Sequence, residues 1–182
     1  MATMTPDQAD VLVMQTMVDT MVGIPKFSYP ARQNNAKKPD GEFAHIRVIE
    51  EYQVGIPKSV VHAQDNDTTT YRIHSPVKLR FRIGVVDTTG IPSSKIMHGW
   101  TTEAIKALMI DSGYGFIRCT TVSSEDAKLE KEWEYRKGFS VEMYTTRIFE
   151  EVVDNMQQLN IGGKLYDEQL NEYLLGFQIN QT

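Results

Sequence analysis

Apolar residues near the start of the sequence recur at spacings of three and four, the period of an α-helix with one buried face. These residues are Val11, Met14, Val18 and Met21. Thr5 and Gln8 stand where a capping box would begin the helix, with Pro6 at its first position. Gly23 would end it. The pattern therefore predicts a first helix over residues 6–22.

The middle of the chain changes to the two-residue alternation of β-strands. We expect strands over residues 42–54, 59–64 and 70–87, of which the last is the longest. One face of this long strand is apolar, with Val77, Leu79, Phe81, Ile83 and Val85. The opposite face carries three cations, which we call the basic stripe: Lys78, Arg80 and Arg82.

A second helix and two further strands are expected after a break rich in Gly and Pro. The helix would span about residues 94–111, with a buried face made of Ile96, Trp100, Ala104, Ile105, Leu108 and Met109. The strands would span residues 114–121 and 139–153. Between them, the charged segment 123–137 fits either a short amphipathic helix or a hairpin tip, and the sequence leaves this open.

The last part of the chain is rich in Leu and aromatic residues, which makes it too apolar for an unstructured terminus. We expect residues 156–182 to form an arm that docks on a neighbouring subunit or another partner. Its candidate contact residues are Leu165, Tyr166, Leu170, Tyr173 and Phe177. Residues 1–155 would form an α+β domain, a mostly antiparallel β-sheet with two packed helices, from which the extended C-terminal arm continues.

Composition narrows the classes of protein to consider. The length of 182 residues fits one well-buried core, and the net charge of −5 argues against a protein whose main task is to coat nucleic acid. The one cysteine, Cys119, cannot form an intrachain disulfide, which suits a reducing compartment. Polar residues interrupt the apolar run 11–22, so we expect neither a signal peptide nor a membrane span.

No cluster of side chains in the sequence has the spacing of a catalytic or metal site. The four histidines match no zinc-binding motif, although His45 and His74 could meet across a sheet. Cys119 has no neighbour that would lower its pKa, so it fits an inert core position. Phosphate-binding and nucleophile motifs are absent from the sequence. We therefore expect no enzymatic activity, no metal and no cofactor.

The basic stripe has two interpretations. In a ring of copies with this face inward, its three residues would be candidate pore-lining residues that face DNA in the lumen. On an ordinary solvent-facing strand they would pair with acidic residues of neighbouring strands, such as Glu50 or Glu142. We favour the second interpretation, and the sequence leaves both open.

A polar loop bounded by prolines precedes the first strand, within the segment FSYPARQNNAKKPDGEFAHIRV at residues 27–48. The loop contains planar hydrogen-bonding groups, which suit a docking element. A proline limits its conformations, and a glycine permits a tight entry to the strand. We call it the docking loop and assign it Arg32, Gln33, Asn34, Pro39 and Gly41. This order of groups, after an N-terminal helix and before a β-strand, resembles the signature of the neck or tail terminator family of tailed phages.

The resemblance extends in outline to about residue 155. It implies a ring of subunits, a hexamer, at the junction of head and tail, which ends the tail tube and binds head connector or adaptor proteins. The docking loop would be a partner contact, and DNA in the lumen would be a further partner. The protein would be a virion component assembled in the host cytoplasm, without a membrane partner. A tail-tube-like or minor tail protein is the alternative within virions, and a small soluble enzyme or ligand-binding domain is the alternative outside them.

Overall fold

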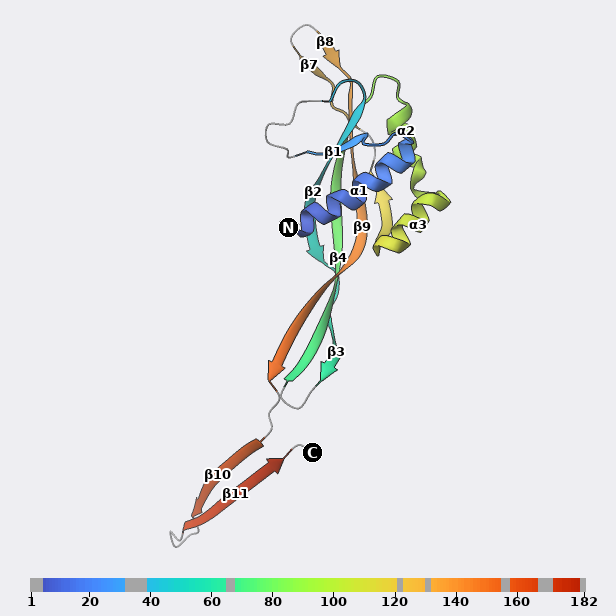
Figure 1. Cartoon of the computed structure of the whole chain (residues 1–182). Coiled ribbons are helices and arrows are strands. Elements are labelled where there is room, and N and C mark those ends of the chain that lie inside the picture. The colour runs from blue at the N-terminus through green and yellow to red at the C-terminus, as the bar shows by residue number, and fades with distance from the viewer. Residues whose placement is uncertain are drawn as a thin grey trace. The chain divides into compact units, whose positions relative to one another are not determined.

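Figure 1 shows the computed structural model, which describes residues 5–31, 39–64, 68–120, 123–129, 132–154, 158–166 and 172–180. Contacts within the chain define two compact units. Unit 1 consists of residues 1–56 and 75–147, and unit 2 consists of residues 57–74 and 148–182. The predicted boundary after residue 155 lies inside unit 2 and stays a prediction.

The described strands form a mixed sheet in the order β1-β2-β4-β9-β5, with β3 beside β4 and β6 beside β9. Their bounds are β1 Ser28–Pro30, β2 Phe43–Gln53, β3 Lys58–Gln64, β4 Thr68–Val86, β5 Gly115–Cys119, β6 Ser123–Ser124 and β9 Arg136–Asp154. The pair β1–β2 is parallel, whereas β2–β4, β3–β4, β5–β9 and β6–β9 are antiparallel. The mostly antiparallel sheet and its long strands are therefore confirmed. Strand β1 was not predicted, because three residues are too few to show an alternating pattern.

Helix α1 spans Pro6–Val22, as the periodicity predicts. The backbone N–H of Gln8 donates to Thr5 Oγ1 at 3.4 Å, and the backbone N–H of Thr5 donates to Gln8 Oε1 at 2.9 Å. This reciprocal pair is the expected capping box. Gly23 ends the helix with a φ of +80°, where a side chain would be strained.

The predicted single helix over 94–111 is wrong, because three short elements replace it. These are α2 Ile91–His98, the 3₁₀ helix η1 Gly99–Thr101 and α3 Glu103–Ser112. Thr102 is extended, with φ −71° and ψ 149°, so the helical period does not carry from α2 into α3. Ala104 is consequently exposed instead of buried. Gly99 lies against helix α1, where an added Cβ would stand 2.7 Å from the Met21 side chain.

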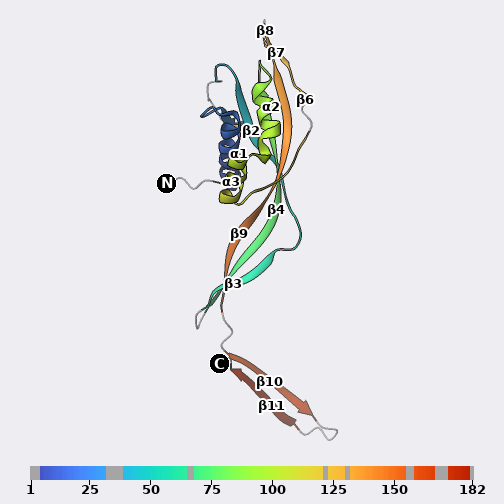
Figure 2. The same cartoon turned by 90° about the vertical axis from the view of Figure 1, so that its right-hand side faces the viewer.

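The core of unit 1 lies between the three helices and one face of the sheet, as Figure 2 shows. All five apolar residues of β4 expected on this face are buried, and Phe139, Val141 and Met143 of β9 join them. From the helices, Met14, Ile96 and the other buried apolar residues complete the cluster. The alternation predicted for β4 is therefore confirmed, with its basic stripe on the opposite side of the sheet.

The charged segment 123–137 forms short strands, which settles the choice between helix and hairpin. After β6, strand β7 (Ala127–Leu129) pairs antiparallel with β8 (Glu132–Glu134). In unit 2, β3 pairs with the first part of β4, and β10 (Gln158–Tyr166) pairs antiparallel with β11 (Glu172–Asn180). The predicted arm therefore contains a β-hairpin.

Candidate interaction surfaces

The sheet face opposite the helices, which we call the open face, carries the basic stripe. A β-bulge in β2 determines which acidic residues reach this face. Up to Val48 the strand alternates as predicted, and its register with β4 then shifts by one residue at Ile49. Directly opposed residues share a face, so Glu50, opposite Arg80, lies on the open face. Glu51 lies on the helix side instead.

Glu142 of β9 is fully buried beneath the open face and binds three cations. Lys78 Nζ lies 2.5 Å from Glu142 Oε2, and the Nη2 atoms of Arg80 and Arg118 lie 2.9 and 2.8 Å from Oε1. Hydrogen bonds from Arg118 and then Lys78 lower the pKa of Glu142 to about 2, against the opposing effect of burial. Glu142 therefore stays ionised at physiological pH.

The other contacts of the stripe also involve acidic partners. Arg80 Nη1 lies 3.0 Å from Glu50 Oε2, and Arg82 forms an ion pair with Glu125. Gly138 leaves room for this second pair, because an added Cβ would lie 2.5 Å from both side chains. The two acidic partners named from the sequence, Glu50 and Glu142, are therefore confirmed as contacts. A pore-lining role for the stripe stays a prediction.

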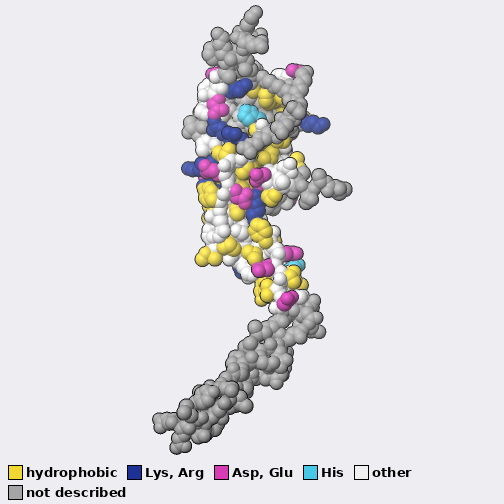
Figure 3. Space-filling view, turned by 90° about the vertical axis from the view of Figure 1, so that its left-hand side faces the viewer, with side chains coloured by type: hydrophobic (Ala, Val, Ile, Leu, Met, Phe, Trp, Pro, Cys, Tyr) yellow, Lys and Arg dark blue, Asp and Glu magenta, His cyan; other side chains and the backbone are white. Residues whose placement is uncertain are grey.

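Positive charge remains on the open face after this pairing. Among the described residues in and next to the stripe, the register and the ion pairs bring together five cations, Arg47, Lys78, Arg80, Arg82 and Arg118, and three carboxylates, Glu50, Glu125 and Glu142. Figure 3 shows how Lys and Arg side chains alternate with Asp and Glu on one side of unit 1. The open face is thus net positive in a chain whose net charge is −5.

The docking loop adjoins two surface hollows. Arg32, Gln33 and Asn34 lie outside the described residues, whereas Pro39 is half-buried and Gly41 has a φ of +84°. One hollow is lined by residues that include Asp7, Gln8, Pro30, Ala31 and Arg47, and the other by residues that include Ala31, His45, Arg47, Arg82 and Glu125. The residues shared by both hollows, Ala31 and Arg47, place them at the start of the loop and on the first strand after it.

Glu42 anchors the end of the docking loop to the turn after β4. Its Oε1 accepts hydrogen bonds from the backbone N–H groups of Thr88 and Thr89, each at 3.0 Å. The Thr88 hydroxyl also donates to it at 2.8 Å. Burial acts to raise the pKa of Glu42, but these hydrogen bonds outweigh it and lower the pKa. The strand entry next to the loop is therefore held in place by an ionised side chain.

A second polar cluster lies between helix α1 and the sheet. Arg147 of β9 donates from Nη1 to Asp10 Oδ1 at 2.9 Å and from Nη2 to Oδ2 at 2.5 Å. Its Nε and Nη2 also donate to Glu51, at 3.0 and 2.9 Å. The hydroxyl of Tyr114 donates to Asp10, and burial followed by this hydrogen bond raises the pKa of Tyr114. Sequence reasoning missed this cluster, although Asp10 precedes Met14 by one helical turn on the buried face.

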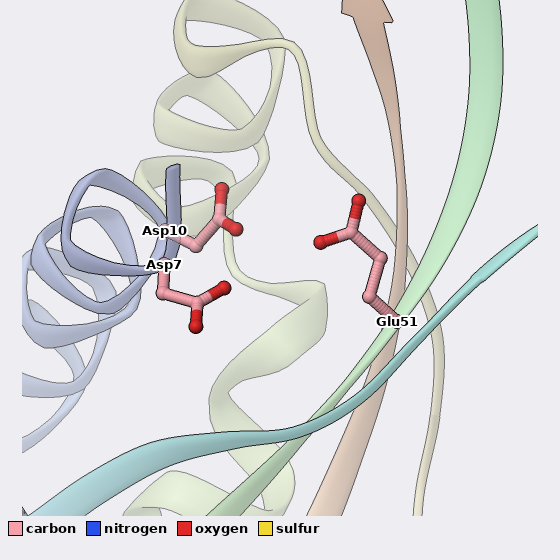
Figure 4. A group of neighbouring side chains, drawn as sticks. All are labelled: Asp7, Asp10 and Glu51. Carbon is pink, nitrogen blue, oxygen red and sulfur yellow. The ribbon is translucent and has the colours of Figure 1, made fainter. Parts of the chain in front are cut away.

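Three carboxylates of this cluster lie close together, as Figure 4 shows. Oxygens of Asp7, Asp10 and Glu51 lie within 4.8 Å of one another. Arg147 binds two of the three groups, so a guanidinium supplies the positive charge that such a set of acids requires. The arrangement fits a structural role, in which Arg147 of β9 holds α1 and β2 through Asp10 and Glu51.

The histidines and the cysteine do not come together in the described part of the chain. His45 lies opposite Gly84 and His74 opposite Lys58, so these two histidines are not cross-strand partners. His62 Nε2 lies 2.8 Å from Arg72 Nη2. Cys119 is half-buried, and burial raises the pKa of its thiol to about 11, which leaves little thiolate at neutral pH.

The predicted arm contacts fall on both strands of the hairpin. Leu165 and Tyr166 belong to β10, and Tyr173 and Phe177 belong to β11. Leu165 lies opposite Tyr173 in the register. Leu170 lies outside the described residues.

The fold is an α+β subunit whose described surfaces offer ion pairs, hollows and uncovered strands for contacts with other proteins. A family model described as phage neck terminator protein matches residues 12–168, so the chain belongs to this family. It is thus a structural protein of the bacteriophage neck, a component of the virion that interacts with other virion proteins. A search of curated proteins found no match. Within the described residues, no helix has the length and apolar character needed to cross a membrane.

Proposed function

We propose that the protein forms a closed ring, a hexamer, between the head connector and the tail. The ring ends the tail tube on one side and receives connector or adaptor proteins on the other, with no enzymatic role. The family match over residues 12–168 is the observation that carries this proposal. The ring would be built in the host cytoplasm and remain in the virion.

The docking loop is the proposed contact with the neighbouring ring. Support comes from the two hollows beside it and from Gly41 and Glu42, which fix how the chain enters β2. The arm would hold the adjacent subunit of the same ring. Such head-to-tail contacts close into a ring when the rotation between subunits permits it.

The basic stripe is the proposed lining of the lumen. Its support is the net positive open face, because excess positive charge attracts phosphate. Glu142 and Glu50 offset part of this charge and leave a weak field. A weak field suits a channel through which DNA must pass without being retained.

Mass measurement of the purified protein, together with electron microscopy of whole particles, tests the proposal. We expect a closed oligomer in solution and density for one or two rings at the neck. Copies distributed along the whole tail would indicate a tube protein and overturn the terminator assignment. A protein missing from virions, with a ligand that stabilises the free chain, would favour the soluble enzyme or ligand-binding alternative.

A further inference from the structure

Arg47 differs from the other cations of the open face in its contacts. Each residue of the basic stripe, and also Arg118, forms an ion pair with a carboxylate of the chain. Arg47 is exposed, and within the described part of the chain its guanidinium has neither an ion pair nor a hydrogen bond. Its positive charge is therefore available to a ligand.

Arg47 lies directly opposite Arg82 in the antiparallel pair of β2 and β4. Opposed residues share a face, with Cβ atoms about 5 Å apart, and like charges in this arrangement repel each other. Glu125 offsets one of the two guanidinium groups through its ion pair with Arg82. One positive charge remains at this position, and an anion with a single negative charge would balance it.

Both arginines line one surface hollow, which has a volume of about 560 Å³. Ser140 of β9 also lines this hollow and is buried, with 8% of its surface exposed. Its backbone N–H donates to Thr120 Oγ1 at 2.8 Å, whereas its hydroxyl has no hydrogen-bond partner among the described residues. The hollow thus brings together guanidinium and hydroxyl donors, which are groups that bind phosphate oxygens in complexes of proteins with DNA.

Two glycines fix the side chains around Arg47. His45, which also lines the hollow, lies opposite Gly84, where an added Cβ would stand 2.3 Å from the imidazole ring. The ring therefore lies against the backbone of β4. Gly138 leaves room for the ion pair of Arg82 in the same way. Because these side chains are already held in place, an anion would bind with little further ordering of the hollow.

A phosphodiester of DNA and a carboxylate of a neighbouring protein each carry one negative charge. The hollow contains Arg82, so it belongs to the same surface as the basic stripe, for which we propose a position in the lumen. DNA is the polyanion that passes there. Its phosphates repeat along both strands, so a duplex of any sequence and any rotation presents phosphates to such a hollow. The position on the open face therefore favours DNA.

We propose that the hollow at Arg47, Arg82 and Ser140 binds a backbone phosphate of DNA, one in each subunit. The proposal rests on the ring and lumen of the proposed function, and it specifies where the DNA contact is made. Lys78 and Arg80 contribute less, because buried Glu142 binds them both. A single phosphate contact in each subunit is weak enough for the DNA to move on.

Binding of a labelled short duplex to the purified full chain, measured by fluorescence anisotropy over a range of salt concentrations, tests the site. For Arg47→Gln we expect binding at low salt to weaken by about fivefold or more. The slope of log K against log salt should fall by about one for each subunit that contacts the duplex. The melting temperature should stay native, because the Arg47 guanidinium contacts no described residue.

The matched control is Arg118→Gln, which removes the same charge from the same face. The Arg118 guanidinium is bound to Glu142, so we expect binding to weaken by less than about twofold. Equal losses in the two variants would show that DNA responds only to the overall field of the face. That result would overturn a site at the hollow.

Ser140→Ala removes a hydrogen-bond donor and no charge. We expect it to weaken duplex binding by about twofold to threefold, whereas Ser94→Ala, at an exposed position of α2, should bind as the native chain does. Equal affinities of these two variants would overturn the placement of the phosphate in the hollow.

Arg47→Lys tests the alternative partner, because a carbodiimide couples a lysine amine to a carboxylate in contact with it. Treated particles whose altered position is joined to an Asp or Glu of another virion protein would overturn the proposal and identify a carboxylate contact. Arg72→Lys is the positive control, which should couple to Glu150 of its own chain.

The ring and the phosphate site can fail separately. If the unaltered chain forms a closed ring but does not bind the duplex, or if Arg47→Gln binds as tightly as the native chain, the phosphate site is wrong while the ring stands. If the chain forms no ring in solution or in virions, the proposed function itself fails.

Discussion

Arg147 and Asp10 are 137 residues apart in the sequence, yet they form a bidentate ion pair with N–O distances of 2.9 and 2.5 Å. Asp10 is buried on helix α1, so its charge needs a partner. Arg147 supplies this partner from the sheet and also binds Glu51. The helix that opens the fold is thereby tied to the face of the sheet that forms the core.

Arg147→Ala should therefore destabilise the fold by about 3–5 kcal/mol, because it leaves a buried carboxylate unpaired. Urea denaturation measures this change in the free energy of unfolding. The matched control is Arg72→Ala, which removes the more exposed pair with Glu150 and should cost less than about 1 kcal/mol. Equal losses in the two variants would show that the pair with Asp10 has no special role.

Glu142 should make the free energy of unfolding depend on pH in the acidic range. Its pKa falls from the ordinary 4.5 to about 2 in the folded chain, so the folded state binds fewer protons than the unfolded state in this range. The stability it contributes is fully present above pH 4.5 and is lost as the pH falls toward 2. Urea unfolding at pH 6 and pH 3 should show a smaller difference for Glu142→Gln than for the native chain. Glu103→Gln, on the exposed surface of α3, should keep the native difference.

Gly99→Ala should destabilise the fold by roughly 1–3 kcal/mol through crowding. The φ of Gly99 is −74°, an ordinary value, so the cost comes from Met21, which an added Cβ would approach to 2.7 Å. Adding Met21→Ala should remove part of this cost in a double-mutant cycle measured by thermal unfolding. Gly115→Ala is the control, because no atom lies within 4 Å of its added Cβ.

Replacing Arg32 and Gln33 with Ala should impair the joining of heads to tails if the docking loop contacts the adjacent ring. Electron microscopy of lysates from the altered phage should then show more free heads and free tails. Lys106→Ala, an exposed change on helix α3, serves as the control for surface charge. Normal particle yields from the loop variant would show that the docking loop does not contribute to the interface with the adjacent ring.

The lumen proposal needs variants that leave Glu142 paired. Charge reversal at Arg80 would place a second carboxylate beside buried Glu142. A loss of DNA ejection in such a variant would then report only misfolding. Arg47→Gln with Arg82→Gln removes two positive charges of the open face and avoids this problem. We expect intact rings and altered kinetics of DNA ejection, measured by release of a DNA-binding dye. Native kinetics would argue against a lumen-facing stripe.

The sequence predicts the candidate surfaces in part. The basic stripe and its partner Glu142 follow from alternation and charge. Glu50 was also named as a partner, but only the register shift at Ile49 brings it to the open face, and Arg118 was missed. Arg118 reaches Glu142 because β5 pairs with β9, a contact that no local pattern encodes. The apolar character of the arm was also evident from the sequence, but the antiparallel pairing of β10 with β11 emerges only from the structure.

Local rules were sufficient for helix α1 and strand β4. A capping box involves residues three apart, and alternation depends only on neighbours along one strand, so the sequence alone determined these elements. The tertiary structure alone decided the shift at Ile49, the break at Thr102 and the pairing of Asp10 with Arg147. Each of these depends on atoms from a distant segment, whose position is set by the packing of helices on the sheet.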